Sequence, residues 1–240
     1  DDGTRWMLVN VYATQYELPD DFDPNTDSKW NYPSTDINGS YLMHIAADGS
    51  TIASLDLSDT NNEDNEDGMS GNLSSFAVDA AGNLYVSDYN NIYVLDAEGN
   101  VQFKLDGSQY NGSLCRLNAQ QVGVMWYNYT DDVNAADENG QYFVPIDLET
   151  KDWGEKVKLP SNVGSILPGD DAYDFYYTYN NNIYGYAAKT DTKEKLVDWL
   201  ACDVDTNNMS GYAMLSDSRV AALMQDWSTD PTTYQLIVLH

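Results

Sequence analysis

Positively charged residues are scarce in this chain of 240 residues. Only 11 Lys and Arg stand against 39 Asp and Glu, which gives a formal net charge of −28. Binding to DNA or RNA requires clustered cations that displace counterions from the phosphates, so this balance excludes a nucleic-acid-binding protein. It disfavours anionic membrane surfaces for the same reason. Cationic ligands, divalent metals and neutral sugars stay open, and the simplest interpretation of the charge is solubility outside the cell.

Histidine and cysteine are almost absent. His44 replaces an apolar residue in an expected strand and His240 is the last residue, so neither lies in a Ser–His–Asp or Cys–His context. The two cysteines, Cys115 and Cys202, form no CxxC pair and no cluster with His. We therefore expect both to be reduced, with no zinc site.

Long hydrophobic runs are also missing, and no stretch of about 20 apolar residues could span a bilayer. The chain opens on Asp1-Asp2-Gly3 and stops within an apolar segment. We expect it to be one domain, residues 1–240, cut from a longer protein.

One short pattern recurs along the chain, an apolar strand followed by an acidic-Gly turn and a second strand. Residues 41–45 lead to Asp48-Gly49, and residues 92–95 lead to Glu98-Gly99, 50 positions later. Further copies start at residues 142 and 182, and the segment 89–93 recurs as 180–184. Periods of about 45 residues with four short strands each are typical of propeller blades. The pattern predicts an all-β fold, a β-propeller of about five blade-like units.

The expected strands follow from short apolar runs between Gly, Asn and Asp turns. The first unit lacks its inner strand and the fifth its outer strand. The missing strands therefore lie beyond the ends of the chain, or the ring is open or closes in a non-standard way. The expected ranges, unit by unit, are 5–14, 41–46 and 51–55; 75–79, 84–88, 92–96 and 101–106; 114–118, 122–129, 142–147 and 155–159; 165–167, 173–178, 183–187 and 194–200; 211–215, 219–224 and 233–239.

The long connections predict a recognition surface. Propeller connectivity places the segments 15–40, 56–73, 128–141 and 225–232 on one face, and they combine acids with aromatic residues. Such side chains stack on sugars or anchor a protein interface, although they can equally pin loops onto the sheets. The candidate binding residues are Trp30, Tyr89, Asn90, Asn91, Tyr127 and Trp227.

Two possible chemical sites each have a plainer competing interpretation. Glu63, Asn65 and Asp67 have the first three ligand spacings of a calcium loop, but no Glu stands at the twelfth position, and a solvated acidic loop is the competing interpretation. No other cofactor is expected. Glycoside hydrolysis needs two carboxyl groups about 5–9.5 Å apart. Asp79 is an acid on an expected inner strand, where it can equally bond turn amides.

The segment 76–88, with its apolar run, Asp, Gly-Asn turn and Leu-Tyr-Val, resembles NHL-type extracellular propeller repeats. The Asp, Asn and Tyr richness also resembles the propeller region of bacterial surface lipoproteins, some of which are fused to a solute-binding domain of an ABC transporter. The resemblance implies a non-catalytic role outside the cell, at a lipid-anchored surface. Its partner would be a carbohydrate, a peptide or a neighbouring domain. A five-bladed glycosidase is the alternative.

Overall fold

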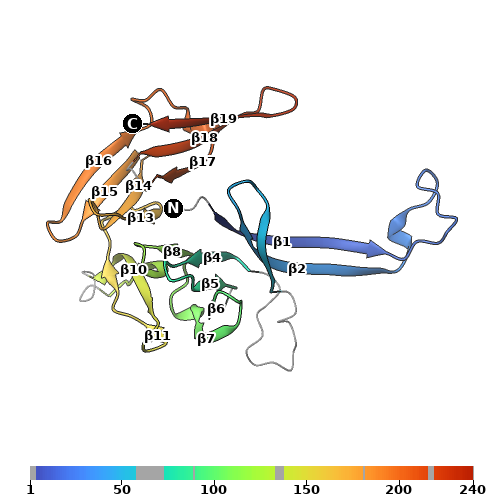
Figure 1. Cartoon of the computed structure of the whole chain (residues 1–240), viewed down its shortest axis with the longest axis horizontal. Coiled ribbons are helices and arrows are strands. Elements are labelled where there is room, and N and C mark those ends of the chain that lie inside the picture. The colour runs from blue at the N-terminus through green and yellow to red at the C-terminus, as the bar shows by residue number, and fades with distance from the viewer. Residues whose placement is uncertain are drawn as a thin grey trace.

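The strands of this protein form five small antiparallel sheets that follow one another around a ring, the arrangement of a five-bladed β-propeller (Figure 1). The computed structural model describes residues 4–57, 73–88, 90–132, 138–180, 182–215 and 219–239. The predicted all-β fold of five units is confirmed. No helix within these residues is long and apolar enough to cross a membrane.

The sheets have three, four, five, four and three strands in chain order. Their bounds are β1 (Arg5–Tyr16), β2 (Ser34–Ile45) and β3 (Thr51–Asp56); β4 (Ser75–Val78), β5 (Leu84–Ser87), β6 (Asn91–Leu95) and β7 (Val101–Asp106); β8 (Leu114–Arg116), β9 (Val122–Asn128), β10 (Gly140–Asp147), β11 (Asp152–Trp153) and β12 (Val157–Lys158); β13 (Ile166–Pro168), β14 (Phe175–Tyr179), β15 (Asn182–Ala187) and β16 (Thr192–Asp198); β17 (Met209–Met214), β18 (Val220–Asp226) and β19 (Thr233–Leu239). Among the described residues, 3-10 turns lie at Lys29–Asn31, Gly107–Gln109 and Thr206–Asn208.

The sequence repeat reappears in the backbone geometry. Gly49 and Gly99 both have positive φ, +86° and +89°, and each donates its N–H to the residue three positions earlier. A β-bulge follows His44 in β2 and Val94 in β6, again 50 positions apart. A left-handed turn residue favours glycine, because a Cβ is strained there. The repeated glycines therefore fix the same turn and the same strand irregularity in the first two blades.

A second repeated device joins an aspartate to a tyrosine. Asp79 follows β4, and its carboxylate accepts from the N–H groups of Ala81 and Asn83, from the Asn83 side chain and from the Tyr85 hydroxyl at 3.0 Å. A shift of 91 residues carries this pair onto Asp170 and Tyr176, whose hydroxyl donates to the carboxylate at 2.5 Å. Burial, and then the Asp79 charge, raise the pKa of Tyr85. The phenol therefore stays a donor, and one carboxylate ties the turn to the next strand.

The core lies between neighbouring blades. Each adjacent pair of sheets shares a cluster of buried side chains, from the first pair to the fourth. Leu42, Tyr93, Val144, Phe175 and Trp199 are among the side chains with at most 1% exposure. Full burial of such a side chain contributes about 1.5–3 kcal/mol, so face-to-face contact between sheets holds the ring together.

Two expectations about the strands need correction. The segment 15–40 is not one long loop, because β1 and β2 continue as paired strands to Tyr16 and from Ser34. The outer strand expected at 155–159 is split into β11 and β12, which both pair with β10. The interruption lies near Pro145 of β10, which has no N–H to donate and accepts from Gly154.

We expect Asp79→Ala to lower the free energy of unfolding by about 2–4 kcal/mol, because the Tyr85 hydroxyl is left buried without an acceptor. Asp96→Ala is the matched control. Asp96 holds an equivalent turn through Glu98 and Asn100, but it is less buried than Asp79. Urea unfolding of both variants measures the difference, and equal losses would contradict the importance of the buried tyrosine.

Acid should remove the contribution of turn aspartates such as Asp96. Hydrogen bonds from the Asn100 side chain and backbone hold the pKa of Asp96 below its ordinary value of 3.8. Because the folded pKa is depressed, the stabilisation is present above the unfolded pKa and is lost as pH falls through the folded value. Urea unfolding of wild type and Asp96→Asn across acidic pH should show a stability difference that shrinks below about pH 4. A difference that is constant with pH would contradict this origin.

Candidate functional site

The first sheet extends into a two-stranded ribbon, residues 11–16 of β1 and 34–39 of β2, which we call the arm. Figure 1 shows the arm projecting away from the ring. β3 pairs with β2 only over Tyr41–Ile45, so the described residues place no third strand beside it. Val11, Tyr12 and Ile37 are exposed on it. An isolated two-stranded ribbon is only marginally stable in water, so the arm is suited to packing against something else.

The base of the arm is fixed by polar contacts to the start of the second blade. Asn10 donates through Nδ2 to the carbonyl of Leu73 at 3.0 Å and accepts from the Ser40 hydroxyl at 2.7 Å. The Ser40 carbonyl accepts from Leu57 N–H. These contacts set the direction in which the arm leaves the ring.

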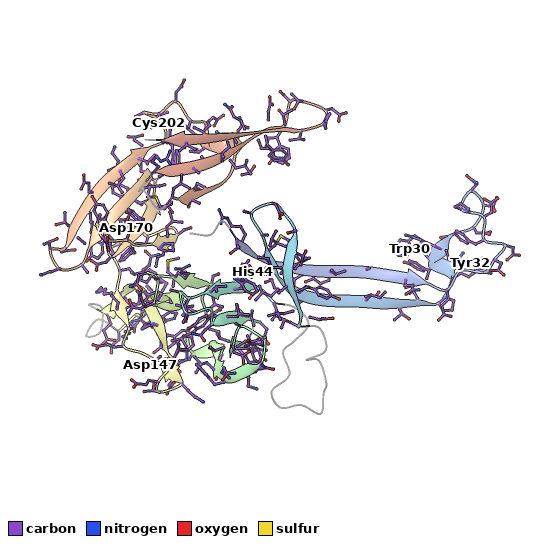
Figure 2. All side chains as sticks on the ribbon, in the orientation of Figure 1. Trp30, Tyr32, His44, Asp147, Asp170 and Cys202 are labelled. Carbon is purple, nitrogen blue, oxygen red and sulfur yellow. The ribbon has the colours of Figure 1, made fainter. Side chains whose placement is uncertain are left out.

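Aromatic side chains cover the far end of the arm, residues 17–33, which we call the tip (Figure 2). Trp30 is 75% exposed and meets Tyr16 edge to face, with ring centroids 5.5 Å apart. The Lys29 ammonium lies 5.1 Å from the Trp30 ring and 5.2 Å from the Tyr16 ring. Phe22 and Tyr32 form a second edge-to-face pair. These contacts order the tip and leave the Trp30 indole outward.

The acids of the tip bond their own loop. The Asp23 carboxylate accepts from the Asn25 N–H and side chain, and Asp27 accepts from the Asp23 N–H. The backbone bond from Asn25 is the main cause that lowers the pKa of Asp23. Among the described residues, no group of three His, Cys, Asp or Glu side chains is arranged to hold a metal ion. Glu63, Asn65 and Asp67 lie outside the described residues.

Trp30, Tyr127 and Trp227 lie on different elements of the fold. Trp30 lies at the end of the arm (Figure 2), Tyr127 near the end of β9, and Trp227 in the turn between β18 and β19. These elements are widely separated in Figure 1. Tyr127 and Trp227 are 61% and 68% exposed. The structure does not bring these three residues together, and their role in binding stays a prediction.

Asn90 and Asn91 of the second blade stabilise the turn between β5 and β6. The Asp88 carboxylate accepts from the N–H groups of Asn90 and Asn91 at 2.7 and 2.6 Å, and the Asn90 carbonyl accepts from Gly107. Their backbone atoms thereby hold the connection between β5 and β6. Tyr89 lies outside the described residues.

A polar hollow of about 570 Å³ was missed by the sequence reasoning. The hollow lies beside the connection from β16 to β17. Its wall includes Trp199 and the polar residues Asn180, Asp198, Asp203 and Asp205. Its sequence signal is the acidic stretch 203–207. Within this stretch Asp205 caps the 3-10 turn and accepts from the Asn207 N–H.

The side chains of His44 and Asp79, which could take part in catalysis by residue type, make structural contacts. His44 stacks on Trp6, with ring centroids 4.4 Å apart and planes 5° apart. Both Asp79 oxygens already accept bonds from the turn and from Tyr85. The two cysteines are free, as predicted, and burial raises the pKa of Cys115 to about 12, which keeps its thiol protonated and unreactive.

Comparison with known proteins found no matching family model and no matching curated protein. Similar solved structures include a Bacteroides caccae protein of unknown function, with 10% identity, a TM-score of 0.41, and 85% of this chain and 73% of that one covered. The extracellular domain of a putative one-component system from B. thetaiotaomicron has 16% identity, a TM-score of 0.40, and coverage of 83% and 26%. BamB from Moraxella catarrhalis has 15% identity, a TM-score of 0.34, and coverage of 79% and 54%. This chain thus spans about a quarter of the length of the one-component-system domain and about half of the length of BamB.

The two tryptophans of the fourth and fifth blades should respond differently to truncation. Trp199 is 1% exposed, so we expect Trp199→Ala to cost about 3–5 kcal/mol of stability through the cavity it leaves. Trp227→Ala, at an exposed turn, should change stability by less than about 0.5 kcal/mol. Thermal unfolding compares the two variants, and a large loss for Trp227→Ala would show that it packs in the fold.

Proposed function

We propose that this chain is a non-catalytic interaction module that binds a protein partner through the arm. The observation that carries the proposal is the exposed Trp30 on a ribbon that leaves the ring. A large aromatic side chain held rigidly by Tyr16 and Lys29 can enter a partner's pocket with little loss of side-chain freedom. Non-catalytic action is supported by the structural bonds of Asp79 and by the stacking of His44 on Trp6.

The negative charge of the tip indicates which kind of partner surface it can bind. The tip carries Glu17, Asp20, Asp21, Asp23 and Asp27, and its single cation, Lys29, lies over aromatic rings. A partner surface of Lys and Arg beside an apolar pocket would complement this surface in charge and shape. The partner we propose is therefore a basic segment of another protein.

The cellular setting belongs to the same proposal. The net charge of −28 and the resemblance of residues 76–88 to NHL-type repeats support a place outside the cell, as part of a bacterial surface lipoprotein. A role beside solute uptake, with a carbohydrate or peptide as ligand, is the finer form of this proposal.

The test measures binding to an array of short synthetic peptides that differ in Lys and Arg content and in apolar residues. We expect binding to basic, partly apolar peptides that weakens as salt rises. Trp30→Ala should weaken it about tenfold or more, as for a central interface residue, with an unchanged melting temperature.

Trp227→Ala is the matched control, because Trp227 is similarly exposed but lies in a different blade. Its binding should equal that of the wild type. Equal binding by Trp30→Ala and wild type, or a preference for neutral peptides, would overturn the proposal.

A further inference from the structure

The last strand of the fifth blade has an open edge. β19 pairs with β18 from Thr233 to Leu239, and no second strand among the described residues pairs with it (Figure 1). In the second and fourth blades, by contrast, a fourth strand, β7 or β16, covers the third one. The outer side of β19 is therefore a template on which one more strand can be added.

The composition of β19 is that of a covered strand. It has the sequence TYQLIVL, without a charged residue or a proline. Edge strands of native proteins usually carry charges that discourage further pairing. The outer strands of the second and fourth blades follow this rule, with the sequences VQFKLD and TKEKLVD. β19 resembles instead the covered third strand β6, NIYVL, but no residue of β19 is buried, whereas four of the five in β6 are.

One face of the edge is apolar and exposed. Leu236 lies directly opposite Leu223 of β18, so both side chains are on the same face of the sheet. Their exposed fractions are 66% and 39%, and Tyr234, two positions before Leu236, is 61% exposed on this face. Ile237 and Leu239 point the other way, into the core cluster shared with the fourth blade. Side chains of an added strand beside Leu236 would therefore gain from being apolar.

The opposite face of the same edge is acidic. A hollow of about 370 Å³ lies there, lined by Gln235 and Ile237 of β19 and by the carboxylates of Asp203, Asp205 and Asp226. No Lys or Arg is among the described residues of its wall. An added strand would direct every second side chain toward these carboxylates. Lys or Arg at those positions would complement them in charge.

We propose that β19 pairs with an extended segment of another protein in which apolar residues alternate with Lys or Arg. The apolar side chains lie beside Leu236, and the cations face the hollow. A second copy of this chain is a poorer occupant, because β19 offers no cation and each chain has a net charge of −28. This edge belongs to the fifth blade and the arm to the first, so the proposal does not depend on the arm.

The probe is a synthetic peptide of alternating valine and lysine with blocked termini, one residue longer at each end than the seven residues of β19. Hydrogen–deuterium exchange of the whole chain is measured with and without it. We expect slower exchange at residues 233–239, because outward N–H groups of β19 become donors to the peptide. A peptide with the valines and lysines in two separate blocks should bind about tenfold more weakly, and one with glutamate in place of lysine should give no protection.

Two modified peptides test backbone pairing. Successive residues of a strand direct their N–H groups to opposite edges, so methylation of the valine nitrogens and methylation of the lysine nitrogens block different edges. One of these peptides should lose affinity about tenfold or more, and the other should keep most of it. Both retain every side chain, so binding through side chains alone would not separate them.

Two pairs of variants locate the site. Leu236→Lys gives β19 a charge like those of β16 and should weaken binding about tenfold or more, with a nearly unchanged melting temperature. Leu148→Lys, at an exposed leucine of the third blade, is its control. Asp203→Asn removes one carboxylate from the hollow and should weaken binding several-fold. Glu155→Gln removes the same charge from the third blade and should leave binding unchanged.

Four results would each overturn the proposal. They are no protection of residues 233–239, equal effects of the two methylated peptides, equal losses from a variant and its control, and a wild-type dimer in sedimentation velocity that Leu236→Lys converts to a monomer. The last result would assign the edge to a second copy of the chain. Trp30→Ala should leave the protection of residues 233–239 unchanged, so failure of this site is distinguishable from failure of the proposed function.

Discussion

The fold depends on carboxylates that bond the backbone of their own turns. In the second and fourth blades, Asp79 and Asp170 also accept from a tyrosine hydroxyl on the next strand. Other turns have a simpler form, in which an aspartate such as Asp147 (Figure 2) accepts from neighbouring N–H groups and from no strand tyrosine among the described residues. Hydrogen bonds to ionised acceptors are stronger than neutral ones. Much of the acidic excess is therefore used locally to define tight turns, and only part of it is free to act on partners.

The arm differs from the rest of the fold, because long exposed strands and not short turns build it. Its strands bury little, its tip is ordered by aromatic contacts, and its attachment relies on Asn10 and Ser40 at the base. The ring supplies a rigid support, and the arm places one tryptophan at a distance from it.

Sequence reasoning predicted the blades well where the repeat is strong. The expected strands 101–106 and 233–239 coincide with β7 and β19, because their apolar runs are bounded by clear turn residues. It missed the arm, because exposed strands bury no regular apolar face and the tip contains three prolines, Pro19, Pro24 and Pro33, that indicate a loop.

The sharing of core clusters between successive blades has a consequence for how the molecule comes apart. Blades two, three and four each have two packed neighbours, whereas the clusters of described residues give the first and fifth blades only one. In such a quasi-linear array, nearest-neighbour contacts set local stability. Opening should therefore begin at the seam between the terminal blades and travel inward, with the middle of the ring the last part to exchange its amide hydrogens.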